Sequence, residues 1–193
     1  GLGTNQQPQD GFPGFMHIVR YYNGALSPEQ VVLNFSAGLL GTNYTGNGGG
    51  ESGTTFSWLR DGSGDWNQSA NWSYGTVPNG NTAMVVLGDA ITSPQTLFTN
   101  RDVVVKKITL DSEHRYVVSG TGNIHLEADE GDAAVNVLHP SIEGAHKFQT
   151  PVDLHSDTFV NVGSGASLVF NNRVNLNGQS LIKTGLGEIF FNN

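Results

Sequence analysis

The last part of the chain contains one pattern twice, and this repeat constrains the fold more than any other feature. Residues 152–172, VDLHSDTFVNVGSGASLVFNN, align with residues 174–193, VNLNGQSLIKTGLGEIFFNN. The alignment pairs Val152 with Val174, Leu154 with Leu176, Phe159 with Leu181, Val160 with Ile182, Gly165 with Gly187, Leu168 with Ile189 and Phe170 with Phe191. A period of about 21 residues is typical of a solenoid, in which each repeat is one coil.

An earlier stretch, residues 108–129, fits the same template. In this alignment Ile108 and Leu110 begin the unit, whereas Ile124 and Leu126 end it. Each unit contains short runs of alternating apolar and polar residues, which are too short to be stable as isolated hairpins. Stacked coils bury a continuous apolar column, so the sequence predicts an all-β fold, a short parallel, right-handed β-helix of about five coils. A β-sandwich is the alternative, but it does not explain the residue-by-residue match.

The composition narrows the classes of partner. Charged residues make up 13% of the 193 residues, and the net charge is −8. Without a cluster of Lys and Arg there is nothing to release phosphate counterions, so nucleic acid is not an expected partner. No apolar stretch is long enough to span a bilayer, so membrane insertion is not expected either. The chain has no cysteine, so backbone pairing and burial must stabilise it without disulfides.

A tryptophan-rich segment, GDWNQSANWSYGTVPNG at residues 64–80, precedes the repeats. One hypothesis is a carbohydrate platform, in which exposed rings stack on sugars and amide side chains hydrogen-bond to them. The candidate residues are Trp66, Trp72, Tyr74, Asn67 and Asn71. The other hypothesis is a Trp-rich cap, in which Trp58, Trp66 and Trp72 close the open end of the solenoid. The position just before the first coil favours the cap.

Two further groups could bind a cation. The turn-like stretch EADEGDAA offers Glu127, Asp129 and Asp132 as oxygen ligands for calcium, the only cofactor that the sequence indicates. None of the six histidines has the spacing of a metal motif. A solenoid could bring His125 and His155 onto neighbouring coils, although the pattern of IHL favours an ordinary outward polar position for His125.

The sequence predicts three parts: a strand and helix in residues 1–40, a Gly/Thr/Asn-rich linker in 41–56, and the cap with the solenoid in 57–193. The first part contains MHIVRYYNGALSPEQVV, in which Ser27, Pro28 and Gln30 form a helix start. This stretch, about residues 12–35, resembles the C-terminal strand and helix of a laminin-G-like (concanavalin-like) lectin domain. The resemblance implies a remnant of such a sandwich and carries over no sugar or calcium site.

The third part, about residues 58–193, resembles passenger domains of bacterial autotransporters. The unit SLIKTGLGEIFF is similar to their Leu-x-Lys-x-Gly-x-Gly-x-Leu repeat. The tryptophan segment is similar to the stretch Gly-x-Trp-x-x-x-x-Asn-Trp-x-x-Gly-x-x-Pro that precedes such repeats, with Gly64, Trp66, Asn71, Trp72, Gly75 and Pro78 in those places. The resemblance implies a β-helix in an extracellular or cell-surface protein of bacterial origin, and it names no function.

The expected function is therefore non-enzymatic: a scaffold, adhesion or glycan-binding module of a larger secreted or cell-surface protein. The first alternative is a structural stalk or self-assembling subunit, because an end coil with Ile189, Phe190 and Phe191 would expose an apolar edge. Further coils, a partner subunit or a fold-back is expected to cover it. The second alternative is a fragment of a β-helix polysaccharide-degrading enzyme. That enzyme requires a groove with convergent carboxylates, or a Lys/Arg–His set on adjacent coils.

Overall fold

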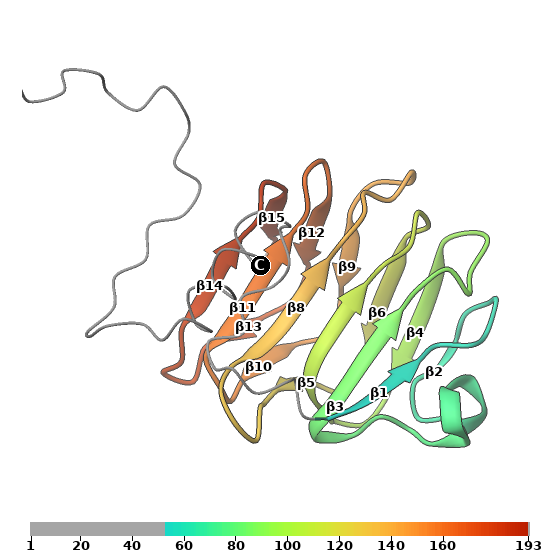
Figure 1. Ribbon diagram of the computed structural model, residues 1–193, viewed down its shortest axis with the longest axis horizontal. Coiled ribbons are helices and arrows are strands. Elements are labelled where there is room, and N and C mark those ends of the chain that lie inside the picture. The colour runs from blue at the N-terminus through green and yellow to red at the C-terminus, as the bar shows by residue number, and fades with distance from the viewer. Residues whose placement is uncertain (1–52, 193) are drawn as a thin grey trace, which may run out of the picture. The chain divides into compact units, whose positions relative to one another are not determined.

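The computed structural model describes residues 53–192, which form an all-β parallel solenoid of about five turns with almost no helix (Figure 1). The predicted fold class is therefore confirmed. These residues belong to one structural unit, residues 51–193. The lectin-like strand and helix and most of the predicted linker lie outside the described residues. Within residues 53–192, no helix is long and apolar enough to cross a membrane.

Two parallel sheets wind along the solenoid. The first contains β1 (Thr54–Ser57), β3 (Gly80–Leu87), β5 (Val103–Leu110), β7 (Ile124–Leu126), β8 (Ala133–Val137), β10 (Val152–Leu154), β11 (Thr158–Val162), β13 (Val174–Asn175) and β14 (Leu181–Thr184). The second contains β2 (Gly64–Asp65), β4 (Gln95–Thr99), β6 (Tyr116–Gly120), β9 (His146–Phe148), β12 (Ser167–Phe170) and β15 (Glu188–Phe191). The predicted linker overlaps β1 at residues 54–56, where Thr-Thr-Phe suits a strand.

The long strand β5 divides the solenoid into two regions. Its first half pairs with β7 and its second half pairs with β8 of the next coil. From that point each coil has three strands, because residues 127–132 separate β7 from β8. The strands β7, β10 and β13 then stack into a narrow third face of their own. We call the outward side of these three strands the β7–β10–β13 face.

The core is a set of stacked columns, each with one residue per coil. In one column Val85, Ile108, Val135 and Val160 pair in register on β3, β5, β8 and β11, and all four are fully buried. Burying one such side chain stabilises the fold by about 1.5–3 kcal/mol. In the second sheet Phe148, Phe170 and Phe191 stack with nearly parallel rings, at centroid distances of 5.4 and 5.2 Å.

The strand register confirms part of the repeat alignment. Val152 pairs with Val174, and Leu168 pairs with Ile189, as predicted. Phe159, however, pairs with Ile182 and not with Leu181. The turn before β14 places Asn177 and Gly178 at positive φ and contains one more residue than the equivalent turn before β11. The next turn is two residues shorter, which restores the match and also displaces the predicted pair of Gly165 with Gly187.

The alignment of residues 108–129 is wrong in its register. Ile124 and Leu126 pair with Val152 and Leu154, so they begin a coil instead of ending one. Ile108 pairs with Val135, on a different face. The error has a simple cause, since an alternating apolar pattern is the same on every face of a solenoid.

The last coil exposes apolar side chains, as the sequence predicts. Phe190 and Phe191 on β15 are each about half exposed, at 45% and 50%. Among the described residues, no strand pairs with the outer edges of β14 and β15. Self-association through this end remains a prediction.

The close stacking of coils predicts an intolerance to added atoms at Gly122. A Cβ atom built there would lie 2.1 Å from the carbonyl oxygen of Arg101 on the adjacent coil. We therefore expect Gly122→Ala to lower the free energy of unfolding by about 2–3 kcal/mol, measured by urea denaturation. Gly88→Ala is the matched control, because its Cβ would meet no atom closer than 3.7 Å, and its effect should stay within about 0.5 kcal/mol. Equal effects of the two substitutions would contradict this stacking.

Candidate functional site

The three tryptophans form a buried plug. Trp58, Trp66 and Trp72 are each 2% exposed or less, and their rings meet edge to face at 5.1 and 4.9 Å. Each indole N–H donates to a backbone carbonyl: Trp58 to Arg60, Trp66 to Pro78 and Trp72 to Trp66. A buried indole needs such a partner, and here the backbone supplies it. The arrangement agrees with the cap hypothesis.

The hypothesis that Trp66 and Trp72 offer flat faces to a sugar is corrected by this burial. Asn71 is also buried, and its side-chain amide donates to the backbone carbonyl of Asp65 at 2.8 Å. Asn67 is half-buried beside Asp65. Of the proposed carbohydrate-binding residues, Tyr74 alone has an exposed ring, with 79% of its surface free. A single ring gives no stacking platform.

The proposed calcium ligands do not converge. Asp129 instead forms an ion pair with Lys106 at 2.9 Å, and this hydrogen bond lowers the pKa of Asp129. Burial and the nearby charge of Asp157 raise the pKa of Asp132. Within residues 53–192, no group of three or more His, Cys, Asp or Glu side chains is arranged to hold a metal ion. Glu127, Asp129 and Asp132 are therefore not a calcium site in this structure.

The β7–β10–β13 face does bring polar groups together. In its central column, His125, Asp153 and Asn175 follow one another in register on three coils. Asp153 is only 5% exposed, and its carboxylate lies between the side chains of Arg173 and His125. Its Oδ1 is 3.4 Å from Nη2 of Arg173, and its Oδ2 is 3.9 Å from Nδ1 of His125. The carboxylate is thus held near the centre of the face.

A histidine pair lies beside this carboxylate. Nδ1 of His125 and Nε2 of His155 are 3.1 Å apart, so the prediction that stacking could bring them onto neighbouring coils is confirmed. Each ring also faces a carboxylate with its other nitrogen: His125 faces Asp102 at 3.6 Å and His155 faces Glu127 at 3.7 Å. Hydrogen bonding from the backbone of Asn123, with a further contribution from His125, lowers the pKa of Asp102.

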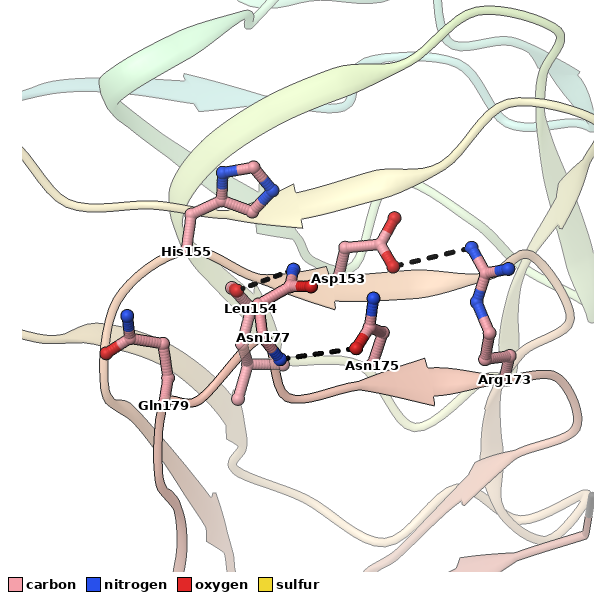
Figure 2. A pocket seen from close by; sticks show the side chains of 7 residues that line it. All are labelled: Asp153, Leu154, His155, Arg173, Asn175, Asn177 and Gln179. Carbon is pink, nitrogen blue, oxygen red and sulfur yellow. Dashed lines mark hydrogen bonds and ion pairs between the residues drawn. The ribbon is translucent and has the colours of Figure 1, made fainter.

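An open groove continues from the pair toward the last coil (Figure 2). Its volume is about 520 Å³, and the lining residues are Asp153, Leu154, His155, Arg173, Asn175, Asn177 and Gln179. Asn177 donates from its side chain to the carbonyl of Leu154 at 3.0 Å, which ties two coils together. All the lining residues except Leu154 have polar side chains. We call this site the amide groove.

Sequence reasoning missed the amide groove. Its residues come from two coils, and no motif spacing links Asp153 with Gln179. The available signal was the repeat itself, because matched positions of a solenoid stack on one face. An alignment that placed His125 over Asp153 and Asn175 would have found the column.

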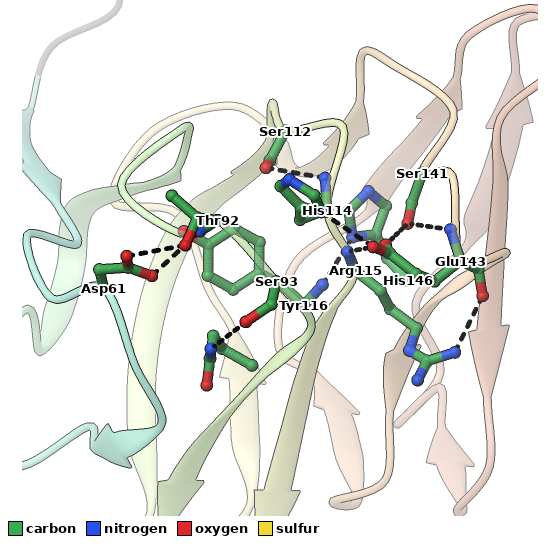
Figure 3. A network of polar contacts seen from close by, with 11 residues as sticks. Asp61, Thr92, Ser93, Ser112, His114, Arg115, Tyr116, Ser141, Glu143 and His146 are labelled. Carbon is green, nitrogen blue, oxygen red and sulfur yellow. Dashed lines mark hydrogen bonds and ion pairs between the residues drawn. The ribbon is translucent and has the colours of Figure 1, made fainter.

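A second polar network joins turns near β6 and β9 (Figure 3). Glu143 is its centre: it contacts Nδ1 of His114 at 2.8 Å and accepts from the backbone N–H of Arg115 at 3.1 Å. The hydrogen bond with His114 is the main cause that lowers the pKa of Glu143. Arg115 in turn donates to the backbone carbonyl of Glu143 at 2.9 Å. These contacts join two turns and leave no converging reactive groups.

His146 lies under this network and is fully buried. Its Nδ1 accepts from the backbone N–H of Tyr116 at 3.1 Å. Burial lowers the pKa of His146 from its ordinary value of 6.5 to about 4, because the cationic ring would lose its hydration. The residue is a neutral structural acceptor.

Comparisons of the chain with protein-family models, curated proteins and solved structures found no match. The solenoid agrees with the β-helix that the autotransporter resemblance implies, but no family is assigned by it.

The buried His146 predicts a stability change with pH. In the unfolded chain the ring binds a proton near pH 6.5, whereas in the folded protein it does so only near pH 4. The unfolded state therefore binds more protons between these values, and stability falls as the pH falls through them, by about 3 kcal/mol. His146→Gln keeps an acceptor and removes this titration, so its unfolding free energy should depend less on pH, as measured by urea denaturation from pH 7.5 to 4. An unchanged dependence would contradict the burial of a neutral ring.

Proposed function

We propose that this chain contributes a non-catalytic, glycan-binding scaffold module to a larger secreted or cell-surface protein. The observation that carries the proposal is the amide groove on the rigid stack of β10 and β13. The preference for a bacterial surface protein rests on the autotransporter resemblance of the sequence. The abundance of Gly, Asn, Ser and Thr agrees with it.

The chemistry of the groove suits sugar hydroxyl groups. Asn175, Asn177 and Gln179 supply amide donors and acceptors in one place. The guanidinium of Arg173 compensates the charge of Asp153, so the groove presents dipoles more than net charge. Binding sites for small polar ligands fix them with a few such convergent groups. We therefore expect an uncharged polysaccharide as the ligand.

The scaffold contributes rigidity. Asp153 and Asn175 lie on paired strands, and the Asn177 side chain is hydrogen-bonded to the preceding coil, so the backbone of the groove and this amide have little freedom to lose on binding. An open, preformed groove of this kind would bind through several weak contacts along a polymer.

The test is affinity electrophoresis of the full chain through gels that contain one neutral polysaccharide each. We expect at least one polysaccharide to retard the wild type, and Gln179→Ala combined with Asn175→Ala to weaken that binding at least tenfold. Gln68→Ala is the matched control, an exposed glutamine of the tryptophan segment that should leave binding unchanged. If Tyr74→Ala abolishes binding while the groove variant does not, the contact surface lies at the tryptophan segment and the proposal fails.

One observation favours a second candidate, a polysaccharide-degrading enzyme. His125, Asp153 and Arg173 come from adjacent coils and approach one another, which is the type of arrangement that such an enzyme requires. Against it, the ion pair with Asp153 engages Arg173, and Asp153 is nearly buried. The same polysaccharides, incubated with the protein, separate the two candidates: the binding proposal expects no shortening of the polymer by size-exclusion chromatography. Shortening that Asp153→Asn abolishes would establish the enzyme instead.

A further inference from the structure

The histidine pair on the β7–β10–β13 face has an unusual polar geometry. Nδ1 of His125 and Nε2 of His155 face each other at 3.1 Å. The opposite nitrogen of each ring faces a carboxylate, Asp102 for His125 and Glu127 for His155. Oδ2 of Asp153 lies 3.9 Å from Nδ1 of His125, so three carboxylates surround the pair. A neutral imidazole has one N–H and one lone pair.

The carboxylates determine where the protons lie. A carboxylate attracts an N–H and repels a lone pair, so it favours the tautomer with the N–H on the nitrogen that faces it. His125 has a carboxylate on both sides, and Asp102, at 3.6 Å from Nε2, is nearer than Asp153, at 3.9 Å from Nδ1, so the nearer one favours the N–H on Nε2. In that tautomer, with the N–H of His155 toward Glu127, Nδ1 of His125 and Nε2 of His155 both present lone pairs across the 3.1 Å gap. Two lone pairs at this distance repel each other unless a positive charge lies between or beside them. The pair is therefore arranged to accept a cation.

The separation of the two nitrogens fits a metal ion. Divalent transition metals bind imidazole nitrogen at about 2.0–2.1 Å, so two nitrogens on one ion are about 2.9 Å apart at a right angle and about 3.3 Å apart at a tetrahedral angle. The observed 3.1 Å lies between these values. The ring planes meet at 79°, so the two side chains approach from different directions and do not stack.

We infer that His125 and His155 together bind one divalent transition-metal ion, with water in its remaining coordination positions. Imidazole ligands favour zinc, nickel and copper over calcium. Asp102 and Glu127 are the partners that hold the two rings in their metal-binding tautomers, as carboxylates do in carboxylate–histidine–metal arrangements. Because the described residues gather no group of three or more His, Cys, Asp or Glu for a metal, the protein supplies two ligands and the binding is modest.

The site does not depend on the proposed glycan binding. His155 lies at one edge of the amide groove, whereas His125 and both carboxylates lie outside its lining. Metal binding can therefore be measured with no polysaccharide present. Failure of the glycan test leaves this inference standing, and the reverse is also true.

The test is isothermal titration calorimetry of the full chain with Zn²⁺ alone, in a buffer that does not chelate metal. We expect one ion per chain, at least a tenfold loss of affinity in His155→Ala, and about a tenfold loss in Glu127→Gln. His139→Ala is the matched control, since His139 is exposed and pairs with Asp111 away from the cluster. It should bind Zn²⁺ as the wild type does, and Ca²⁺ should give no heat with any of the proteins.

Two results would overturn the inference. One is a wild type that binds no Zn²⁺, which would make the pair an ordinary hydrogen bond in which one ring donates to the other. The other is equal affinity in the wild type and His155→Ala.

The His155 side chain is 42% exposed, so its replacement should not unfold the chain. Thermal unfolding followed by circular dichroism checks this. His155→Asn keeps a polar side chain and removes the imidazole, so it should lose Zn²⁺ affinity as His155→Ala does.

Discussion

Parallel stacking of apolar side chains in register is the constraint on which the rest of the structure depends. The column of Val85, Ile108, Val135 and Val160 is fully buried, because each coil places one branched aliphatic residue directly over the equivalent residue of the coil before it. The backbone hydrogen bonds between coils form in the same register, so core packing and strand pairing reinforce each other. A slip by one residue would turn every inward side chain outward.

The same register organises the outer surface. When inward residues stack, the residues between them stack as well, and His125, Asp153 and Asn175 form such an outward column. The separation of β7 from β8 matters here, because it turns one long strand into two short ones and gives this column a face of its own. Both proposals concern this face: the amide groove as a sugar contact and the histidine pair as a metal site. Rigid stacking holds the groups of both in place before any ligand arrives.

The architecture could be predicted from the sequence more completely than the candidate site. The repeat predicted a solenoid because a period of this length has few other structural explanations. It misplaced Phe159 by one residue, since turns of a solenoid vary in length and a compensating change in the next turn hides the difference. The tryptophan segment allowed both a platform and a cap, because the aromatic residue types are the same in each. Burial of Trp66 decided between them, and burial depends on contacts that the sequence does not display.

The most direct measurement of the central claim is disulfide trapping of the strand register, since the chain has no cysteine of its own. Asn161 and Thr184 pair on β11 and β14, and their side-chain oxygens lie 3.3 Å apart on the same side. Paired strands are about 4.8 Å apart, within the range a disulfide can bridge. We predict that Asn161→Cys combined with Thr184→Cys oxidises within the monomer, while Asn161→Cys combined with Lys183→Cys does not. Efficient oxidation of the second pair alone would contradict the register, and with it the placement of the amide groove and of the column of His125, Asp153 and Asn175.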